Sequence, residues 1–322
     1  MKPDLLLICP LFPAAMAQLD AAYTVHRYHE APDKDAFIAK ISDRITAAAT
    51  AGHEGMPVAL MGRFPKLKII SCFGVGVDGI DVPAARKLGI AVTNTPDVLT
   101  ECVADNALAL VLATLRRTVF NDKFVRAGNW LKGNAPLAEK VSGSRLGIIG
   151  LGRIGRAVAR RAAGFRMRII YNSTSRAPAE IEKELNAEFK TRDEVFEQAD
   201  FLSLHVPLNA ATRGLVGSAE LARMKRSAFL INTTRGPVVQ EAALIAALER
   251  GIIAGAALDV FEREPLIPDG LRRDNVVLAP HLGSASIETR TRMALIAVEN
   301  AIAFFAGKRP PTVLNPEALT QS

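Results

Sequence analysis

The chain has 322 residues, of which 49% are hydrophobic and 23% are charged, a composition that excludes a disordered or collagen-like protein. This length exceeds that of one typical core, so we expect two domains. No apolar run reaches the roughly 20 residues that cross a bilayer, and the first residues do not resemble a signal peptide. The formal charge of +7 comes from dispersed Lys and Arg, which indicates a solvated basic surface suited to anionic ligands and not a nucleic-acid site.

The three cysteines, Cys9, Cys72 and Cys102, are widely separated and lie in apolar surroundings. This pattern predicts neither a disulfide framework nor a Cys-x-x-Cys metal site. We expect buried thiols in a reducing cytoplasm, no bound metal, and no membrane partner.

Short apolar strands alternate with Ala-rich amphipathic segments along almost the whole chain, which is typical of parallel βαβ units. The predicted strands are 5–8, 45–48, 68–70, 146–149, 168–171, 201–205, 228–231, 254–258 and 276–278. Longer periodic segments predict one continuous helix over residues 100–126 and another over 286–305. The predicted fold class is therefore α/β, with two doubly wound parallel-sheet domains and hinges near residues 96–100 and 283–286.

A glycine-rich turn, Gly150-Leu151-Gly152-Arg153-Ile154-Gly155, separates the strand at 146–149 from a helical run. Gly150 permits the tight turn, Gly152 lets the backbone approach a pyrophosphate, and Gly155 lets helix and strand pack closely. The phosphates would lie at the helix N-terminus, where free N–H groups favour negative charge. Such a turn can be purely structural, but its strand–turn–helix context favours dinucleotide binding.

The loop after the next predicted strand bears on the choice of cofactor. NAD-selective sites place a carboxylate there to accept from the ribose 2′-hydroxyl. This loop instead reads Asn172-Ser173-Thr174-Ser175-Arg176, and the first carboxylate follows at Glu180. Hydroxyls and a guanidinium can bind a 2′-phosphate, so the loop predicts NADPH in preference to NADH. The alternative is a polar loop with an incidental Arg.

Three motifs follow the carboxyl ends of predicted strands, where ligands bind in open α/β sheets. They contain Asn232-Thr233-Thr234-Arg235-Gly236, then Leu258-Asp259 through Glu264-Pro265, and then Ala279-Pro280-His281-Leu282-Gly283-Ser284-Ala285. Reduction of a keto acid needs a cation for the carboxylate and carbonyl, an acid for the new alkoxide, and a group that keeps the acid charged. Arg235, His281 and Glu264 can supply these in turn.

Histidines at strand ends are also common as packed or capped residues. His205, which precedes Val206-Pro207 after another strand, is comparable to His281 and is expected to line the cofactor cleft. His26 and His29 lie in a polar stretch and are expected to have no role in the site.

These motifs, together with those at 71–78 and 93–100, resemble the D-isomer-specific 2-hydroxyacid dehydrogenases, in particular glyoxylate/hydroxypyruvate reductases and plant-type hydroxyphenylpyruvate reductases. The resemblance covers nearly the whole chain and implies a catalytic set of Arg235, Glu264 and His281. It also implies an NAD(P)-binding Rossmann domain, residues 99–285, inserted into a flavodoxin-like substrate-binding domain made of residues 1–98 and 286–322. The loop that would decide substrate identity, near residues 49–53, departs from the best-known reductases.

The resemblance further implies that the backbone N–H groups of Val75 and Gly76 bind the substrate carboxylate, although an ordinary turn is the alternative. It implies a homodimer in which Trp130 approaches the active site of the partner subunit, the alternative being a local packing anchor. The expected substrate-binding residues are Val75, Gly76, Arg235, His281 and Ser284. The expected cofactor-binding residues are Gly150, Gly152, Arg153, Ile154, Gly155, Ser173, Thr174, Ser175, Arg176, His205, Val206, Pro207, Thr212, Thr233, Thr234, Arg235, Asp259, His281 and Gly283.

The leading hypothesis is an NADPH-dependent reductase that converts hydroxypyruvate or glyoxylate to a D-2-hydroxy acid by hydride transfer, with His281 as proton donor. One alternative is an NAD-linked enzyme of the same fold, such as a phosphoglycerate or formate dehydrogenase. Another is a nucleotide-sensing binding protein that resembles transcriptional corepressors of similar fold.

Overall fold

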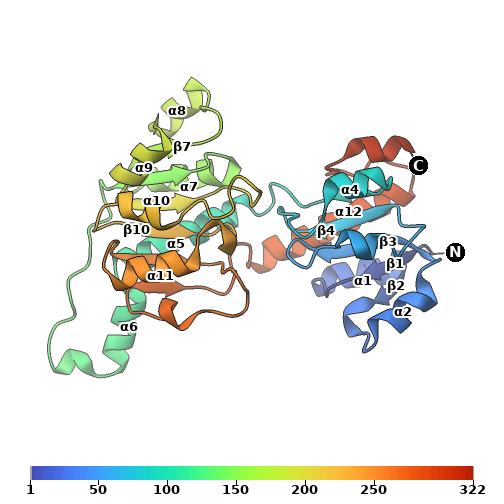
Figure 1. Cartoon of the computed structure of the whole chain (residues 1–322), viewed down its shortest axis with the longest axis horizontal. Coiled ribbons are helices and arrows are strands. Elements are labelled where there is room, and N and C mark those ends of the chain that lie inside the picture. Colours follow the sequence, from blue (N-terminus) through green and yellow to red (C-terminus); the bar gives the residue numbers. More distant parts are fainter. Residues whose placement is uncertain (1, 322) are drawn as a thin grey trace. The chain divides into compact units, whose positions relative to one another are not determined.

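The computed structural model describes residues 2–321, which form two compact units (Figure 1). The first unit combines the chain up to Leu99 with the chain from Ser286 onward, and the second unit is Thr100–Ala285. Each unit has one parallel sheet with helices on both faces, which confirms the predicted fold class. No helix within residues 2–321 combines the length and apolar character that a membrane span requires.

The first unit contains a five-stranded parallel sheet in the order β2-β1-β3-β4-β5, the order of flavodoxin-like folds. Its strands are β1 (Asp4–Leu7), β2 (Thr24–Arg27), β3 (Ile45–Ala51), β4 (Ile69–Phe73) and β5 (Ala91–Thr93). Its helices are α1 (Pro13–Ala22), α2 (Lys34–Ile41), α3 (Val58–Met61), α4 (Val82–Lys87) and α12 (Ile287–Phe305), with 3-10 turns at Tyr28–Glu30 and Pro316–Gln321.

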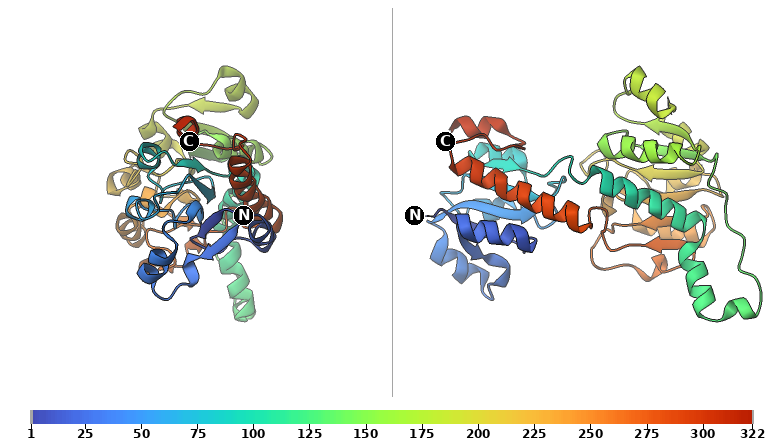
Figure 2. Two further views of the ribbon diagram at one scale, coloured as in Figure 1. Left: turned by 90° about the vertical axis from the view of Figure 1, so that its right-hand side faces the viewer. Right: turned by 180° about the vertical axis from the view of Figure 1, so that it is seen from behind.

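Both faces of this sheet are covered, which explains why its strands read as continuous apolar runs. Leu5 and Leu7 point to the face where α1 and α12 lie side by side (Figure 2). Leu6 points to the other face and packs with Ile38 and Ile41 of α2. Helix α12 begins where predicted, because the side chain of Ser286 accepts from the amide of Thr289 and caps it.

The second unit contains a seven-stranded parallel sheet in the order β12-β11-β10-β9-β6-β7-β8, a Rossmann order with one further strand at the β12 edge. Its strands are β6 (Arg145–Ile149), β7 (Arg168–Asn172), β8 (Ala187–Phe189), β9 (Phe201–Leu204), β10 (Phe229–Asn232), β11 (Gly255–Leu258) and β12 (Val276–Leu278). Helices α5 (Thr100–Leu115) and α7 (Arg153–Ala163) contribute to the core on one face. On the other face lie α9 (Arg192–Gln198), α10 (Ser218–Arg223) and α11 (Glu241–Glu249). The short helix α8 (Ala179–Leu185) packs with β8, and 3-10 turns occupy Asn129–Leu131, Gly236–Val238 and Asp269–Leu271.

The expected continuous helix over residues 100–126 is wrong. Two helices occupy this range, α5 and α6 (Thr118–Arg126), because the backbone of Arg117 takes a left-handed conformation with φ of 53°. None of the residues of α6, all of which the structure describes, is buried. Helix α6 begins near the amino ends of β10 and β12 and extends away from the sheet, and an extended segment returns from it to β6 (Figure 1).

Three short strands, β2, β5 and β8, were not predicted from the sequence. They have only three or four residues each, and β2 and β8 are edge strands with polar or exposed positions, so neither shows a clear apolar run. His26 lies in β2, where Nε2 is 2.7 Å from Oδ1 of Asp4. Cys9 and Cys72 are buried as predicted, whereas Cys102 is partly exposed.

Candidate active site

The turns that carry the predicted site residues lie along one edge of the seven-stranded sheet. Parallel strands place their carboxyl ends at the same edge, so the strand order fixes the order of these turns. Along the edge from β12 to β7, the turns carry in succession His281, Glu264, Arg235, His205, Gly150 and Ser173. The three predicted catalytic residues therefore follow three neighbouring strands. The glycine turn follows β6, and the loop of residues 172–176, called the ribose loop below, follows β7.

Glu264 and His281 are in direct contact. Nδ1 of His281 lies 2.7 Å from Oε2 of Glu264, and since a carboxylate only accepts, Nδ1 is the donor. Glu264 is itself held in place, because its Oε1 accepts from the amide of Phe261 at 3.0 Å. The His281 side chain is 37% exposed and that of Glu264 is 29% exposed, so the pair is open to a small ligand.

The loop that carries His281 is held by Asp259, which is 1% exposed at the end of β11. Its two carboxylate oxygens accept from the amides of Leu282 and Gly283, each at 2.7 Å, and from Nδ2 of Asn106 at 3.0 Å. The backbone carbonyl of Asp259 also accepts from the amide of His281. Burial raises the pKa of Asp259 above its ordinary value, an effect that the amide bonds oppose. These bonds hold His281 in a left-handed conformation with φ of 54°.

Arg235 lies in the turn after β10, which Asn232 organises. Oδ1 of Asn232 accepts from the amide and the hydroxyl of Thr234, and its Nδ2 donates to the carbonyl of Arg235 at 3.0 Å. A Cβ at Gly236 would collide with the backbone of Phe261, so only glycine lets this turn approach the segment that follows β11. Arg235 is partly exposed, and its Nη1 donates to the carbonyl of Thr234 at 2.8 Å.

The glycine turn has the geometry that dinucleotide binding requires. Gly150 has φ of 98°, and a Cβ there would lie 2.6 Å from the carbonyl oxygen of His205. A Cβ at Gly155 would collide with the carbonyl of Gly150, so helix α7 packs closely on the turn. At Gly152 nothing lies within 4 Å of an added Cβ, which leaves open space against the backbone at the start of α7. A pyrophosphate fits this cradle.

The other predicted cofactor residues differ in burial and in hydrogen bonding. The Thr233 hydroxyl is buried and has no hydrogen-bond partner among residues 2–321, which leaves a polar atom for a bound group to satisfy. The Thr212 hydroxyl donates to the carbonyl of Pro207 and closes its own loop. Ile154 and Val206 are partly buried, and each packs against one of the two core clusters of the unit.

His205 is largely buried beside the glycine turn. Nε2 of its ring lies 2.8 Å from the hydroxyl of the buried Ser203, and its amide donates to the carbonyl of Ile149. Burial lowers the pKa of His205 to about 4, so the ring is neutral near pH 7. A neutral ring that supports the turn differs from the open, carboxylate-paired ring of His281.

The ribose loop contains an interaction that the sequence did not reveal. Nε and Nη2 of Arg176 donate to the two carboxylate oxygens of Glu182 at 2.9 and 2.8 Å. Glu182 also accepts from the hydroxyl of Tyr171 at 2.6 Å. Nearer the glycine turn, the Ser173 hydroxyl accepts from the amide of Leu151 at 2.7 Å. The only sign of this contact in the sequence is that Glu182 follows Arg176 by six residues and lies near the start of a helix.

The predicted carboxylate loop at Val75 and Gly76 lies in the first unit, after β4. Neither backbone N–H donates to an acceptor within the described residues. The carbonyl of Val75 accepts from Nδ2 of Asn94 at 3.0 Å, and the amide of Gly74 donates to the hydroxyl of Thr95 at 3.0 Å. The loop is therefore held from behind, while two consecutive amides remain able to bind an anion.

Trp130 lies in the segment after α6 and is 66% exposed. The neighbouring Leu131 and, further along the segment, Leu137 are each 95% exposed. This exposure does not support the alternative role of Trp130 as a local packing anchor.

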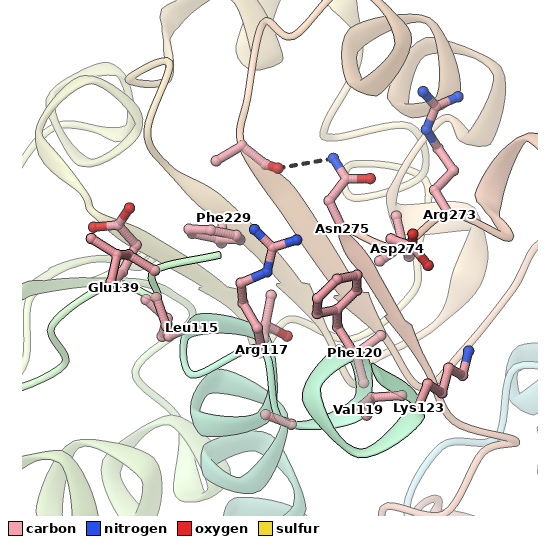
Figure 3. Close-up of a pocket in the computed structure, with 17 residues that line it drawn as sticks. Leu115, Arg117, Val119, Phe120, Lys123, Glu139, Phe229, Arg273, Asp274 and Asn275 are labelled. Carbon is pink, nitrogen blue, oxygen red and sulfur yellow. Dashed lines mark hydrogen bonds between the residues drawn. The ribbon is translucent and has the colours of Figure 1, made fainter. Parts of the chain in front are cut away.

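A cavity of about 180 Å³ lies elsewhere in the second unit (Figure 3). Its wall includes Phe229, the first residue of β10, and residues 275–277 around the start of β12. On the same wall, Cζ of Arg117 lies 4.6 Å from the ring centroid of Phe120. These residues surround the amino ends of the strands, at the edge opposite to His281, so the cavity is separate from the site.

Comparisons with known proteins agree with this arrangement. Residues 108–283 match the family described as "D-isomer specific 2-hydroxyacid dehydrogenase, NAD binding domain". A glyoxylate reductase from Korarchaeum cryptofilum is 48% identical over 89% of this chain and 88% of its own length. A glyoxylate reductase from Thermococcus litoralis is 44% identical over 100% of this chain and 99% of its own.

Solved structures give the same result for the whole chain. An NADPH-dependent glyoxylate/hydroxypyruvate reductase from Sinorhizobium meliloti, in complex with NADP and malonate, aligns with a TM-score of 0.90 and 39% identity, covering 99% of this chain and 98% of that one. A 2-hydroxyacid dehydrogenase from Ketogulonicigenium vulgare aligns with a TM-score of 0.89 and 42% identity, covering 98% of both chains. The chain therefore belongs to the D-isomer specific 2-hydroxyacid dehydrogenase family, and it is an oxidoreductase of that class.

Proposed function

We propose that the protein reduces small 2-keto acids, glyoxylate and hydroxypyruvate, to D-2-hydroxy acids with NADPH. The observation that carries this proposal is the contact between Nδ1 of His281 and the carboxylate of Glu264, next along the sheet edge to Arg235. Relatives along the full chain are named glyoxylate reductases, which supports a small keto acid as substrate.

In the proposed reaction, Arg235, His281 and Glu264 each have a different role. Arg235 binds the substrate carboxylate and polarises the carbonyl through its planar guanidinium, with charge-assisted hydrogen bonds worth about 1.5–3 kcal/mol each. His281 gives a proton to the alkoxide oxygen from Nε2, because Nδ1 faces Glu264. Glu264 stabilises the imidazolium and fixes the ring plane. A reduced nicotinamide, when bound, supplies the hydride.

The substrate carboxylate has further proposed ligands. In the first unit these are the amides of Val75 and Gly76, held from behind by Asn94. In the second unit Ser284, three residues after His281, is partly exposed and carries a hydroxyl that suits a small polar substrate.

The proposed cofactor is NADPH. Its pyrophosphate fits the open space beside Gly152, where the start of α7 offers the amides of Arg153, Ile154 and Gly155. Its 2′-phosphate fits the loop of hydroxyls and a guanidinium from Ser173 to Arg176. The Sinorhizobium neighbour was solved with NADP, which supports this choice. The other proposed cofactor contacts are Gly150, Thr174, Ser175, His205, Val206, Pro207, Thr212, Thr233, Thr234, Arg235, Asp259, His281 and Gly283.

We also propose a homodimer that forms through the segment around α6. Val119 and Val125 of α6 are 43% and 53% exposed, and Trp130, Leu131 and Leu137 follow with still greater exposure. This concentration of apolar side chains on a projecting segment is typical of an interface. Trp130 would then lie near the active site of the partner subunit. Loss of the dimer in Leu131→Asp, measured by light scattering, tests the interface.

The same proposal places the enzyme in the cytoplasm with no nucleic-acid partner. Cys9, Cys72 and Cys102 are all thiols, which suits a reducing compartment. Several of the scattered basic residues form ion pairs with carboxylates on the surface, as Arg160 does with Glu184.

The decisive experiment is a matrix of kcat/KM for glyoxylate, hydroxypyruvate, pyruvate and phenylpyruvate, each with NADPH and with NADH. We expect the highest values for the first two acids with NADPH, and a D-product by chiral analysis. Higher values with NADH would contradict the cofactor assignment and favour an NAD-linked enzyme. No turnover of any keto acid with either cofactor would contradict the reductase, and would favour a nucleotide-sensing binding protein.

A further inference from the structure

The guanidinium of Arg176 is held by the carboxylate of Glu182, and Tyr171 bonds to the same carboxylate. Glu182 of α8 accepts from Nε and Nη2 in a two-bond fork, and Tyr171 of β7 donates its hydroxyl to the same carboxylate at 2.6 Å. The Tyr171 hydroxyl in turn accepts from the amide of Ala177 at 2.8 Å. One connected network therefore joins the strand, the loop and the helix around Arg176.

A carboxylate near a ribose loop has two possible roles. It can accept from the ribose 2′-hydroxyl, which selects NADH, or it can position a cation for the 2′-phosphate of NADPH. Here both oxygens of Glu182 are already occupied by Arg176 and Tyr171, and the Glu182 side chain is only 13% exposed. The Arg176 side chain is 67% exposed. The Glu182 carboxylate is therefore largely shielded from a bound ligand, whereas the Arg176 guanidinium is exposed to it.

We propose that Glu182 and Tyr171 are positioning residues that hold Arg176 ready for the 2′-phosphate, and so determine the preference for NADPH. This inference rests on the proposed function, which takes NADPH as the cofactor. The two hydrogen bonds to Glu182 come from Nε and Nη2 of Arg176. Because the guanidinium is planar and rigid, these bonds also fix the position of Nη1. A side chain fixed before binding loses less rotamer entropy when the phosphate arrives.

The loop itself is fixed at both ends. The Ser173 hydroxyl accepts from the amide of Leu151 in the glycine turn, and Ala177 donates to Tyr171. Tyr171 is completely buried, with its ring 5.4 Å from that of Phe189 in an edge-to-face contact. Arg176 thus lies between two fixed points, and the first of them, Ser173, contacts the turn that would hold the pyrophosphate.

The negative charge of Glu182 affects phosphate binding in a second way, apart from its contact with Arg176. The Glu182 carboxylate is ionised at neutral pH, since the fork with Arg176 and the Tyr171 hydroxyl lower its pKa to about 2. Its charge repels a phosphate, so a Gln at this position changes both charge and positioning. Tyr171→Phe removes the hydroxyl that fixes the carboxylate and changes no charge, and it is therefore the sharper test.

The experiment measures Kd by calorimetry with the full-length protein for NADPH, NADH, 2′,5′-ADP and 5′-AMP. We expect Tyr171→Phe and Glu182→Gln to raise the Kd for NADPH and 2′,5′-ADP by about 3- to 10-fold, and Arg176→Ala by about 10- to 100-fold. Binding of NADH and 5′-AMP should stay within about twofold, since no contact to the shared part of the cofactor changes. Glu184→Gln is the matched control, because Glu184 lies on the same helix and pairs with Arg160 at 2.7 Å, outside this loop.

The outcomes separate the inference from the proposed function. Tighter NADPH binding in Glu182→Gln, or unchanged binding in Tyr171→Phe, would overturn the positioning role. Weaker NADH binding in Glu182→Gln would assign the carboxylate to the ribose and would also overturn it. A wild-type protein that binds NADH more tightly than NADPH would overturn the proposed cofactor itself. Near-ultraviolet circular dichroism of each variant shows whether the buried Tyr171 site keeps its packing.

Discussion

Oε2 of Glu264 lies 2.7 Å from Nδ1 of His281, while Oε1 of the same carboxylate accepts from the backbone amide of Phe261. The carboxylate therefore connects the histidine to the backbone that follows β11. A carboxylate that accepts from one ring nitrogen fixes the orientation of the histidine ring. This is the arrangement that general acid catalysis needs.

The first prediction concerns this pair. His281→Asn removes the proposed proton donor and should lower kcat by about 10²- to 10⁴-fold with little change in thermal stability. Glu264→Gln keeps an acceptor for Nδ1 but replaces a charged acceptor with a neutral one. We expect kcat for keto-acid reduction to fall by about 10-fold, the difference between a charged and a neutral hydrogen bond, which is less than the loss in His281→Asn. Steady-state rates at saturating substrate and cofactor measure both losses.

Glu262→Gln is the control for that variant, because the Glu262 carboxylate accepts from the amide of Glu241 and does not contact His281. Its kcat should match that of the wild type. An unchanged kcat in Glu264→Gln would show that the charge of the carboxylate does not contribute to catalysis.

The sequence predicted the sheets because both of their faces are covered and their strands are apolar throughout. It predicted the positions of Arg235, Glu264 and His281 along the sheet for a simple reason. Each follows the carboxyl end of a strand, and parallel strands end at one edge. The direct contact between Glu264 and His281 follows from that rule once β11 and β12 are neighbours.

Contacts that depend on side chains from distant segments could not be predicted. Asn106 of α5 reaches Asp259, 153 positions away, and nothing in the local pattern connects them. The helix break at Arg117 had no signal either, since neither Gly nor Pro occurs between Thr100 and Arg126. In both cases tertiary packing decides the local structure.

The second prediction concerns Asp259, whose carboxylate accepts from two amides and from Asn106. In Asp259→Asn one oxygen becomes an NH₂ group, which cannot accept from the amide of Gly283. The loop should then lose its fixed geometry and kcat should fall by about 10- to 100-fold, because misplacement of a catalytic group by 1 Å is costly. Asn106→Leu removes only one of the three donors and should cost less. Equal losses of kcat in both variants, measured at saturating substrate, would contradict this ranking.

The third prediction concerns the pH dependence of stability through His205, whose pKa burial lowers to about 4. The unfolded chain has a histidine pKa near 6.5, so between these values it binds more protons than the native protein. Stability against urea should therefore fall as pH drops from about 6.5 to about 4, with His205 contributing about 1–3 kcal/mol of the loss.

His205→Gln does not titrate and can still bond to Ser203, so its stability relative to the wild type should rise as pH falls through this range. Urea titrations of the cofactor-free protein at neutral and acidic pH give the comparison. His53→Gln is the control, because the His53 side chain is 65% exposed. An identical pH dependence in wild type and His205→Gln would refute the prediction.

The fourth prediction sets two glycines of the same turn against each other. Gly150→Ala places a methyl group at positive φ and 2.6 Å from the carbonyl oxygen of His205, so the variant should lose about 1–3 kcal/mol of folding stability. Gly152→Ala meets open space at φ of −77°, so its folding stability should be unchanged or slightly higher. The same methyl group would occupy the space assigned to the pyrophosphate, and the Kd for NADPH should rise by about tenfold or more. Urea unfolding and calorimetric binding, applied to both variants, separate the two effects. Normal NADPH binding by Gly152→Ala would show that the cofactor phosphates lie elsewhere.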